Sequence, residues 1–212
     1  MSSARLIDNP KALAGLAFIL GLSANPIIKL LRMMRNRKKK THREDKVYVG
    51  IELGGTNFSV AIGVPHYGED GRINSFTIRN QMTGRTEGNP EATVDHIKEF
   101  LKDETYEFIG ICTFGPLCLD QHSPKFGFIT STPKTTYRDF PILQHIKSKT
   151  KARHYGFDTD VNAPAYAEFH LGNHDVKESL IYVTVGTGVG IGVIANKKTV
   201  HGLVHPEGGH IM

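Results

Sequence analysis

Three glycine-rich turns follow apolar runs that read as strands, and two of them carry a threonine hydroxyl. The turns are Gly54-Gly55-Thr56-Asn57, Gly115-Pro116 and Gly186-Thr187-Gly188. Glycine lets the backbone approach a phosphate closely and point N–H groups at it, and a hydroxyl adds a donor. No turn has the G-K-[ST] ending of a Walker A loop, and the third does not open a helix as a dinucleotide fingerprint does. A lone Gly-Gly also fits a plain hairpin turn, but two Gly-Thr turns between strand pairs favour phosphate binding.

Asp160 stands between a predicted strand and a predicted helix that begins at Asn162. A carboxylate at such a junction can simply cap the N-terminus of the helix. It can also lie at the mouth of a cleft and accept a proton from a substrate hydroxyl, with Asn162 binding the same substrate. The spacing alone does not distinguish these two roles.

The elements that must position these residues begin at Lys46. Asn89 followed by Pro90 is typical of a helix start, and the spacing of the next apolar residues extends that helix to Lys102. Two more helices are expected over 141–149 and 162–171. Strands are expected over 47–53, 59–64, 72–79, 108–114, 154–158, 179–185 and 190–195. A hairpin, a third strand and then alternating helices and strands predict a mixed α/β sheet.

The composition fits a globular protein. Of the 212 residues, 39% are hydrophobic and 22% are charged. Two cysteines, Cys112 and Cys118, are too few for a disulfide framework, which indicates a reducing compartment.

The first 45 residues differ from the rest in charge. Residues 1–46 hold 11 of the 26 basic residues and 3 of the 21 acidic ones, which leaves 15 basic and 18 acidic residues beyond them. The slightly acidic remainder argues against nucleic-acid binding by the globular part. The apolar run over 12–22 is about half the roughly 20 residues of a membrane-spanning helix. With the basic run over 35–40, it leaves three interpretations open: a solvated extension of a cytoplasmic protein, a membrane-surface contact, or an organelle-targeting leader.

From Val47 onward the sequence resembles the ROK family of sugar kinases, and within it the bacterial-type fructokinases. Six segments carry the resemblance in order and spacing: VYVGIELGGTNFSVAIG, FGPL, GFITSTPK, GFDTDVNAPAYAE, VTVGTGVGIG and HGLVHPEGGHI. The resemblance implies an α/β, actin-like ATPase (ribonuclease H-like) fold with two domains around a cleft. The first domain is expected over 46–159 and the start of the second over 160–212.

The resemblance also implies ATP-dependent phosphorylation of a hexose, with fructose favoured. Asp160 matches the catalytic base, and Gly115 and Pro116 match a loop that closes over the sugar. Asn162, Glu207 and His210 match sugar-contacting positions. The phosphate-binding positions are Gly54, Gly55, Thr56, Asn57, Gly186, Thr187 and Gly188. ATP and Mg²⁺ are the implied cofactors, and Glu52 is expected to hold the magnesium through water.

Other members of this family keep several alternatives open. These are a glucokinase, an N-acetylmannosamine kinase, a non-catalytic kinase-like remnant and a sugar sensor. A homodimer is expected for the full-length form.

The resemblance further implies a zinc site with His210 as one ligand. The family continues past G-H-I with more zinc ligands, mostly cysteines, whereas this sequence stops at Met212. Because a structural zinc takes four ligands, the site is incomplete within these residues. We therefore expect the sequence to be the front part of a longer kinase, and these 212 residues alone to be inactive.

Overall fold

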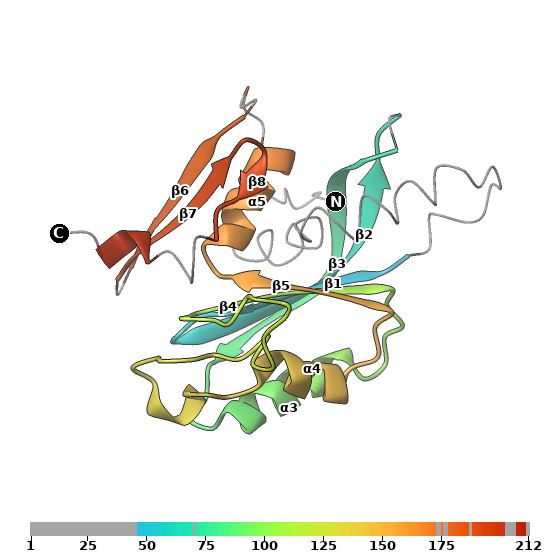
Figure 1. Ribbon diagram of the computed structural model, residues 1–212. Helices are drawn as coiled ribbons and strands as arrows, with labels where there is room; N and C mark the ends of the chain where they lie inside the picture. Colours follow the sequence, from blue (N-terminus) through green and yellow to red (C-terminus); the bar gives the residue numbers. More distant parts are fainter. Residues whose placement is uncertain are drawn as a thin grey trace.

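The computed structural model of the chain describes residues 46–69, 71–172, 175, 178–186, 188–201 and 207–210. The expected leader, residues 1–45, lies outside the described residues. The helices α3 (Pro90–Leu101) and α4 (Ile142–Lys149) lie below a larger sheet, and a smaller sheet with α5 (Asn162–Leu171) lies above it (Figure 1).

The larger sheet has five strands in the order β3-β2-β1-β4-β5. Its strands are β1 (Tyr48–Leu53), β2 (Asn57–Tyr67), β3 (Ile73–Arg85), β4 (Phe108–Thr113) and β5 (His154–Thr159). β1 pairs with β2 and β2 with β3 in antiparallel fashion, while β1, β4 and β5 run parallel. The predicted mixed sheet is confirmed, although β2 and β3 are longer than expected because exposed polar positions extend their pairing.

Two helices, α3 (Pro90–Leu101) and α4 (Ile142–Lys149), lie together on one face of this sheet (Figure 1). The predicted cap is present, since the Asn89 side chain accepts a hydrogen bond from the Glu91 backbone N–H. The inward face of α3 is almost completely buried at Val94, Ile97 and Leu101. Each such side chain contributes about 1.5–3 kcal/mol on burial, so this face fixes α3 to the sheet.

The smaller sheet is antiparallel, in the order β6-β7-β8, and α5 (Asn162–Leu171) packs against it. Its strands are β6 (Leu180–Val185), β7 (Val189–Ala195) and β8 (Lys198–Thr199). Asn196 and Lys197 both have positive φ, which is the tight turn expected between β7 and β8. The short helix η4 (Gly208–His210) follows beside β7.

The two faces of the smaller sheet differ in exposure. One face contacts α5 so closely that a Cβ on Gly192 would lie 2.1 Å from the Val161 carbonyl oxygen. On the other face Ile181 is 66% exposed and Val185 is 78% exposed. An apolar sheet face of this kind is normally covered in a folded domain.

Within the described part of the chain, no helix is long and apolar enough to cross a membrane.

Candidate active site

Two adjacent cavities lie where β5, the smaller sheet and the glycine turns meet. The smaller cavity, of about 210 Å³, is lined among others by Gly115, Asp160 and Glu207. The larger, of about 370 Å³, is lined among others by Glu52 and the first glycine turn. Asp160 and Gly188 line both cavities. Asp160 therefore stands at the boundary between two spaces that can hold two different ligands.

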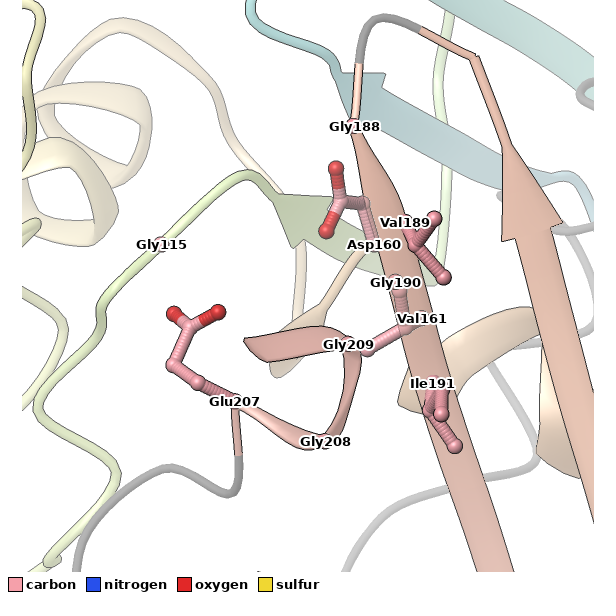
Figure 2. Close-up of a pocket in the computed structure, with 10 residues that line it drawn as sticks. All are labelled: Gly115, Asp160, Val161, Gly188, Val189, Gly190, Ile191, Glu207, Gly208 and Gly209. Atoms are coloured by element: carbon pink, nitrogen blue, oxygen red, sulfur yellow. The ribbon is translucent and has the colours of Figure 1, made fainter. Parts of the chain in front are cut away.

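The smaller cavity brings two carboxylates to one space. Figure 2 shows the Asp160 and Glu207 side chains directed toward the same opening, with Gly115 across from them. Gly209 forms part of the wall and lies so close to β7 that a Cβ there would be 1.8 Å from the Val189 carbonyl oxygen. Carboxylates and backbone groups around a small space suit a ligand that offers several hydroxyl groups.

Asp160 does not cap α5, which answers the question left open by the sequence. The Thr159 hydroxyl accepts from the Asn162 backbone N–H at 3.0 Å. The N-cap residue of α5 is Val161, without a side-chain capping bond among the described residues. The Asp160 backbone N–H donates to the Thr113 carbonyl at 3.0 Å, which fixes the turn to the end of β4. The capping interpretation is wrong, and the carboxylate lies on the cavity walls instead.

The environment makes Asp160 a stronger base than an ordinary aspartate. Burial, which removes water from the carboxylate, is the main reason that its pKa is raised from 3.8 to about 6, and the nearby Glu207 charge contributes to the same rise. A hydrogen bond from its own backbone N–H works in the opposite direction. At neutral pH such a group is mostly ionised yet holds a proton more tightly than a free carboxylate, which suits a general base.

The glycine turns line the larger cavity, but their glycines differ in role. A Cβ on Gly54 would lie 2.9 Å from the Asn57 carbonyl oxygen, so Gly54 shapes the turn itself. Around Gly55, Gly186 and Gly188, by contrast, no atom of the described chain lies within 4 Å of where a Cβ would stand. Thr56, Asn57, Gly186 and Gly188 also line this cavity. The predicted Thr187 lies outside the described residues.

Lys134 ties the first glycine turn to the rest of the site. Its ammonium group donates to the carbonyl oxygens of Gly55 at 2.9 Å and Thr86 at 3.0 Å. The same group lies 5.0 Å from the centre of the buried Tyr137 ring. The GFITSTPK segment alone does not predict this role of its lysine, because the lysine lies 79 residues from the turn.

Glu52 lines the larger cavity together with the first glycine turn. Carboxylate oxygens are the ligands that Mg²⁺ prefers, and magnesium held by one carboxylate and substrate phosphates needs no dedicated cluster. Glu52 therefore fits the expected role. Among the described residues no group of three or more His, Cys, Asp or Glu side chains converges as a metal site.

The remaining predicted sugar contacts, Pro116, Asn162 and His210, are not among the residues that line either cavity. His210 is exposed, and its Nδ1 lies 3.3 Å from a Glu207 carboxylate oxygen. Asn162 is buried, and its side-chain nitrogen donates to Asp158 at 3.1 Å. The Pro116 carbonyl accepts from the Thr130 backbone N–H at 2.7 Å. Of the predicted sugar contacts, the structure thus places Gly115 and Glu207 in the cavity wall with Asp160.

Comparison with known proteins identifies the relatives of this chain. The sequence model of the ROK family matches residues 48–212. A putative fructokinase from Bacillus subtilis is 40% identical over 162 residues, which cover 76% of this chain and 50% of that protein. A fructokinase from Zymomonas mobilis is 37% identical over 169 residues, or 79% of this chain and 54% of that protein.

A solved structure agrees with the sequence comparison. The ROK family glucokinase from Streptomyces griseus, in complex with glucose and AMPPNP, superposes with a TM-score of 0.59 at 25% sequence identity. The match covers 78% of this chain and 50% of that one, so the chain spans about half the length of the relatives it matches. The expected actin-like ATPase fold is confirmed. With a family match over 48–212 and a shared fold, the chain belongs to the ROK family.

Proposed function

We propose that the complete protein transfers the γ-phosphoryl group of ATP to a hydroxyl group of a hexose, with fructose as the preferred sugar. The observation that carries this proposal is the position of Asp160, which lines both cavities. In that arrangement the hexose occupies the smaller cavity and the ATP phosphates occupy the larger one. One carboxylate then faces the hydroxyl group and the phosphoryl group at the same time.

The proposed reaction is an in-line displacement with Asp160 as general base. Asp160 accepts the proton of the sugar hydroxyl as that oxygen attacks the γ-phosphorus. A new P–O bond forms to the sugar, the bond to the β–γ bridging oxygen breaks, and ADP leaves. Catalysis of this kind depends on positioning and charge stabilisation more than on covalent chemistry.

The glycine turns and Glu52 serve the nucleotide. Backbone N–H groups of the turns at Gly55 and Gly188 bind phosphate oxygens, since glycine leaves room for close approach. Glu52 would hold Mg²⁺ through water. When bound, the metal neutralises charge that develops on the phosphates.

Fructose is proposed because two relatives of this chain are named a putative fructokinase and a fructokinase. Their identity of 37–40% exceeds the 25% identity to the glucokinase that binds glucose. The shared fold with that glucokinase makes glucose the second candidate. Discrimination between the two sugars would come from the groups around Glu207 and Gly115.

A substrate panel tests the proposed function. Fructose, glucose, mannose and N-acetylmannosamine are supplied with Mg-ATP to the complete protein, and ADP formation is followed by a coupled assay. We expect the highest kcat/KM with fructose. If the folded complete protein forms no ADP with any of the four sugars, the proposed function is wrong.

We also propose that residues 46–159 form a first domain and residues 160–212 begin a second. The five-stranded sheet with α3 and α4 falls in the first, and α5 with the smaller sheet falls in the second. Expression of residues 46–159 alone would test this division, since a first domain is expected to fold by itself, and an unfolded polypeptide would contradict it.

A further inference from the structure

Asp158 is a buried carboxylate beside the site, and the proposed reaction does not use this carboxylate. Its side chain is 3% exposed, and it lies two residues before Asp160 at the end of β5. Burying an ionised carboxylate costs several kcal/mol unless hydrogen bonds and opposite charge compensate for the lost water. The partners of Asp158 therefore indicate what the group is for.

Three donors surround Asp158: two belong to the turn that follows it, and one comes from a distant part of the chain. The Thr159 backbone N–H donates at 2.8 Å and the Asn162 side-chain nitrogen at 3.1 Å. The third partner is His201, whose Nε2 lies 2.8 Å from the other carboxylate oxygen. His201 follows β8 and is 43 residues away in sequence. This contact thus joins the Asp160 turn to the chain that leads toward Glu207.

The electrostatics favour a charged pair. The hydrogen bond from His201 to Asp158 raises the pKa of the imidazole, and the negative charge of Asp158 adds to the effect. Loss of water around His201 lowers its pKa to a smaller extent. A protonated imidazole can only donate, and a carboxylate can only accept, so the pair has a single hydrogen-bond polarity.

Asp158 also fixes the orientation of the Asn162 amide. Because a carboxylate accepts but does not donate, the amide must turn its nitrogen toward Asp158. The amide oxygen of Asn162 is buried and has no hydrogen-bond partner among the described residues. Asn162 is therefore held in one orientation by Asp158, across the turn that bears Asp160.

We propose that Asp158 and His201 form a positioning pair that holds the Asp160 turn in place, with the Asn162 amide fixed by the same carboxylate. The proposal rests on the proposed function for the identity of the ligand. Neither residue needs to touch the reacting atoms. Their effect passes through Asn162 and through the geometry of the turn that bears Asp160.

Kinetics of the complete protein test the pair. His201→Ala and His201→Asn both remove the donor that reaches Asp158, whereas His201→Gln keeps a side-chain N–H at similar reach. We expect the two loss variants to lower kcat by about 10–100-fold, the scale of a small misplacement of reacting groups, and to raise the KM for the sugar. The KM for ATP should stay unchanged, and His201→Gln should recover most of the activity.

The matched control is His122→Ala, which removes an exposed loop histidine. It should behave like the unaltered protein. Since the His201 side chain is 36% exposed, its truncation opens a gap to solvent and should leave the fold intact. Loss variants that retain normal kcat and sugar KM, with only a lower Tm, would show a purely stabilising contact and overturn the proposal.

A second readout does not depend on turnover. The side-chain amide signals of Asn162 are assigned in an NMR spectrum by their loss in Asn162→Ser. We expect them to shift in His201→Ala and to return toward their original position in His201→Gln. Unmoved Asn162 signals in His201→Ala overturn the positioning role. This holds even if the substrate panel shows no kinase activity, so the two proposals fail separately.

Discussion

Replacement of Asp160 by Asn should abolish most activity and at the same time stabilise the fold. The carboxylate stands in a site that raises its pKa from 3.8 to about 6. An Asn of nearly the same shape cannot accept the proton of a sugar hydroxyl. We expect kcat of the complete protein to fall about a hundredfold or more, with a much smaller change in sugar binding.

The size of the stabilisation follows from the pKa difference. The interval between 3.8 and about 6 corresponds to about 3 kcal/mol at 1.36 kcal/mol per pH unit, and partial exposure of Asp160 makes this an upper value. Since the folded pKa is raised, the unfolded chain loses its proton first as pH increases. The unaltered protein therefore loses this stability between about pH 4 and pH 6, and the loss is complete above that window. Asp160→Asn does not undergo this loss.

Two measurements check the reasoning. Urea unfolding at pH 4 should give similar stabilities for both proteins, whereas at pH 7 the variant should be more stable by up to about 3 kcal/mol. The kcat/KM of the unaltered protein should fall about tenfold from pH 7 to pH 5, which follows from a base with a pKa of about 6. Asp103→Asn, an exposed carboxylate after α3, is the control and should change neither quantity.

The outcome that would refute this reasoning is a variant with lower stability at pH 7 or with near-normal turnover. Lower stability would mean that the Asp160 carboxylate makes favourable contacts in the fold. Near-normal turnover would remove it from the role of base.

Three further predictions concern the glycine turns, Lys134 and the exposed sheet face. Gly55→Val and Gly188→Val should each raise the KM for ATP and lower kcat with little change in Tm, because no described atom lies near either position. Gly192→Val should instead destabilise the fold, and unchanged ATP kinetics in the first two variants would mean that the turns are plain hairpin turns. Lys134→Met should raise the KM for ATP by about tenfold, which corresponds to a loss of about 1.4 kcal/mol of hydrogen bonding to Gly55 and Thr86. Lys125→Met on the surface should leave this KM unchanged, and equal kinetics for both variants would mean that Lys134 does not hold the first glycine turn. The double variant Val183→Thr, Val185→Thr should reduce light scattering by the 212-residue polypeptide, because both side chains are exposed, and an unaltered polypeptide that stays monomeric would contradict this. The same variant should lower the Tm of the complete protein if the exposed sheet face is covered there.

The sequence by itself determined the elements and the family. Asn89 and Pro90 marked the start of α3 because the capping bond and the proline geometry involve only adjacent residues. The turn at Asn196 and Lys197 was equally local. Six segments, in their order and spacing, resembled the ROK family, and the family match and the shared fold confirmed it.

The strand ends were less predictable, since β2 and β3 continue through polar positions only because each supplies hydrogen bonds to the other. The roles of single glycines were also undecided. Gly55 and Gly192 look alike in the sequence, but one faces a cavity and the other receives the backbone of Val161. Such differences depend on which distant segment lies opposite.

Only the tertiary structure decided how the site is built. It showed that the Thr159 hydroxyl, and not the Asp160 carboxylate, accepts the hydrogen bond from the Asn162 backbone N–H at the start of α5, and that the carboxylate lies on both cavity walls. It brought Lys134 to Gly55 and His201 to Asp158, contacts that span 79 and 43 residues. Local patterns carry no information about such pairs, because their distance is set by the packing of the smaller sheet and the connecting loops against the end of the larger sheet.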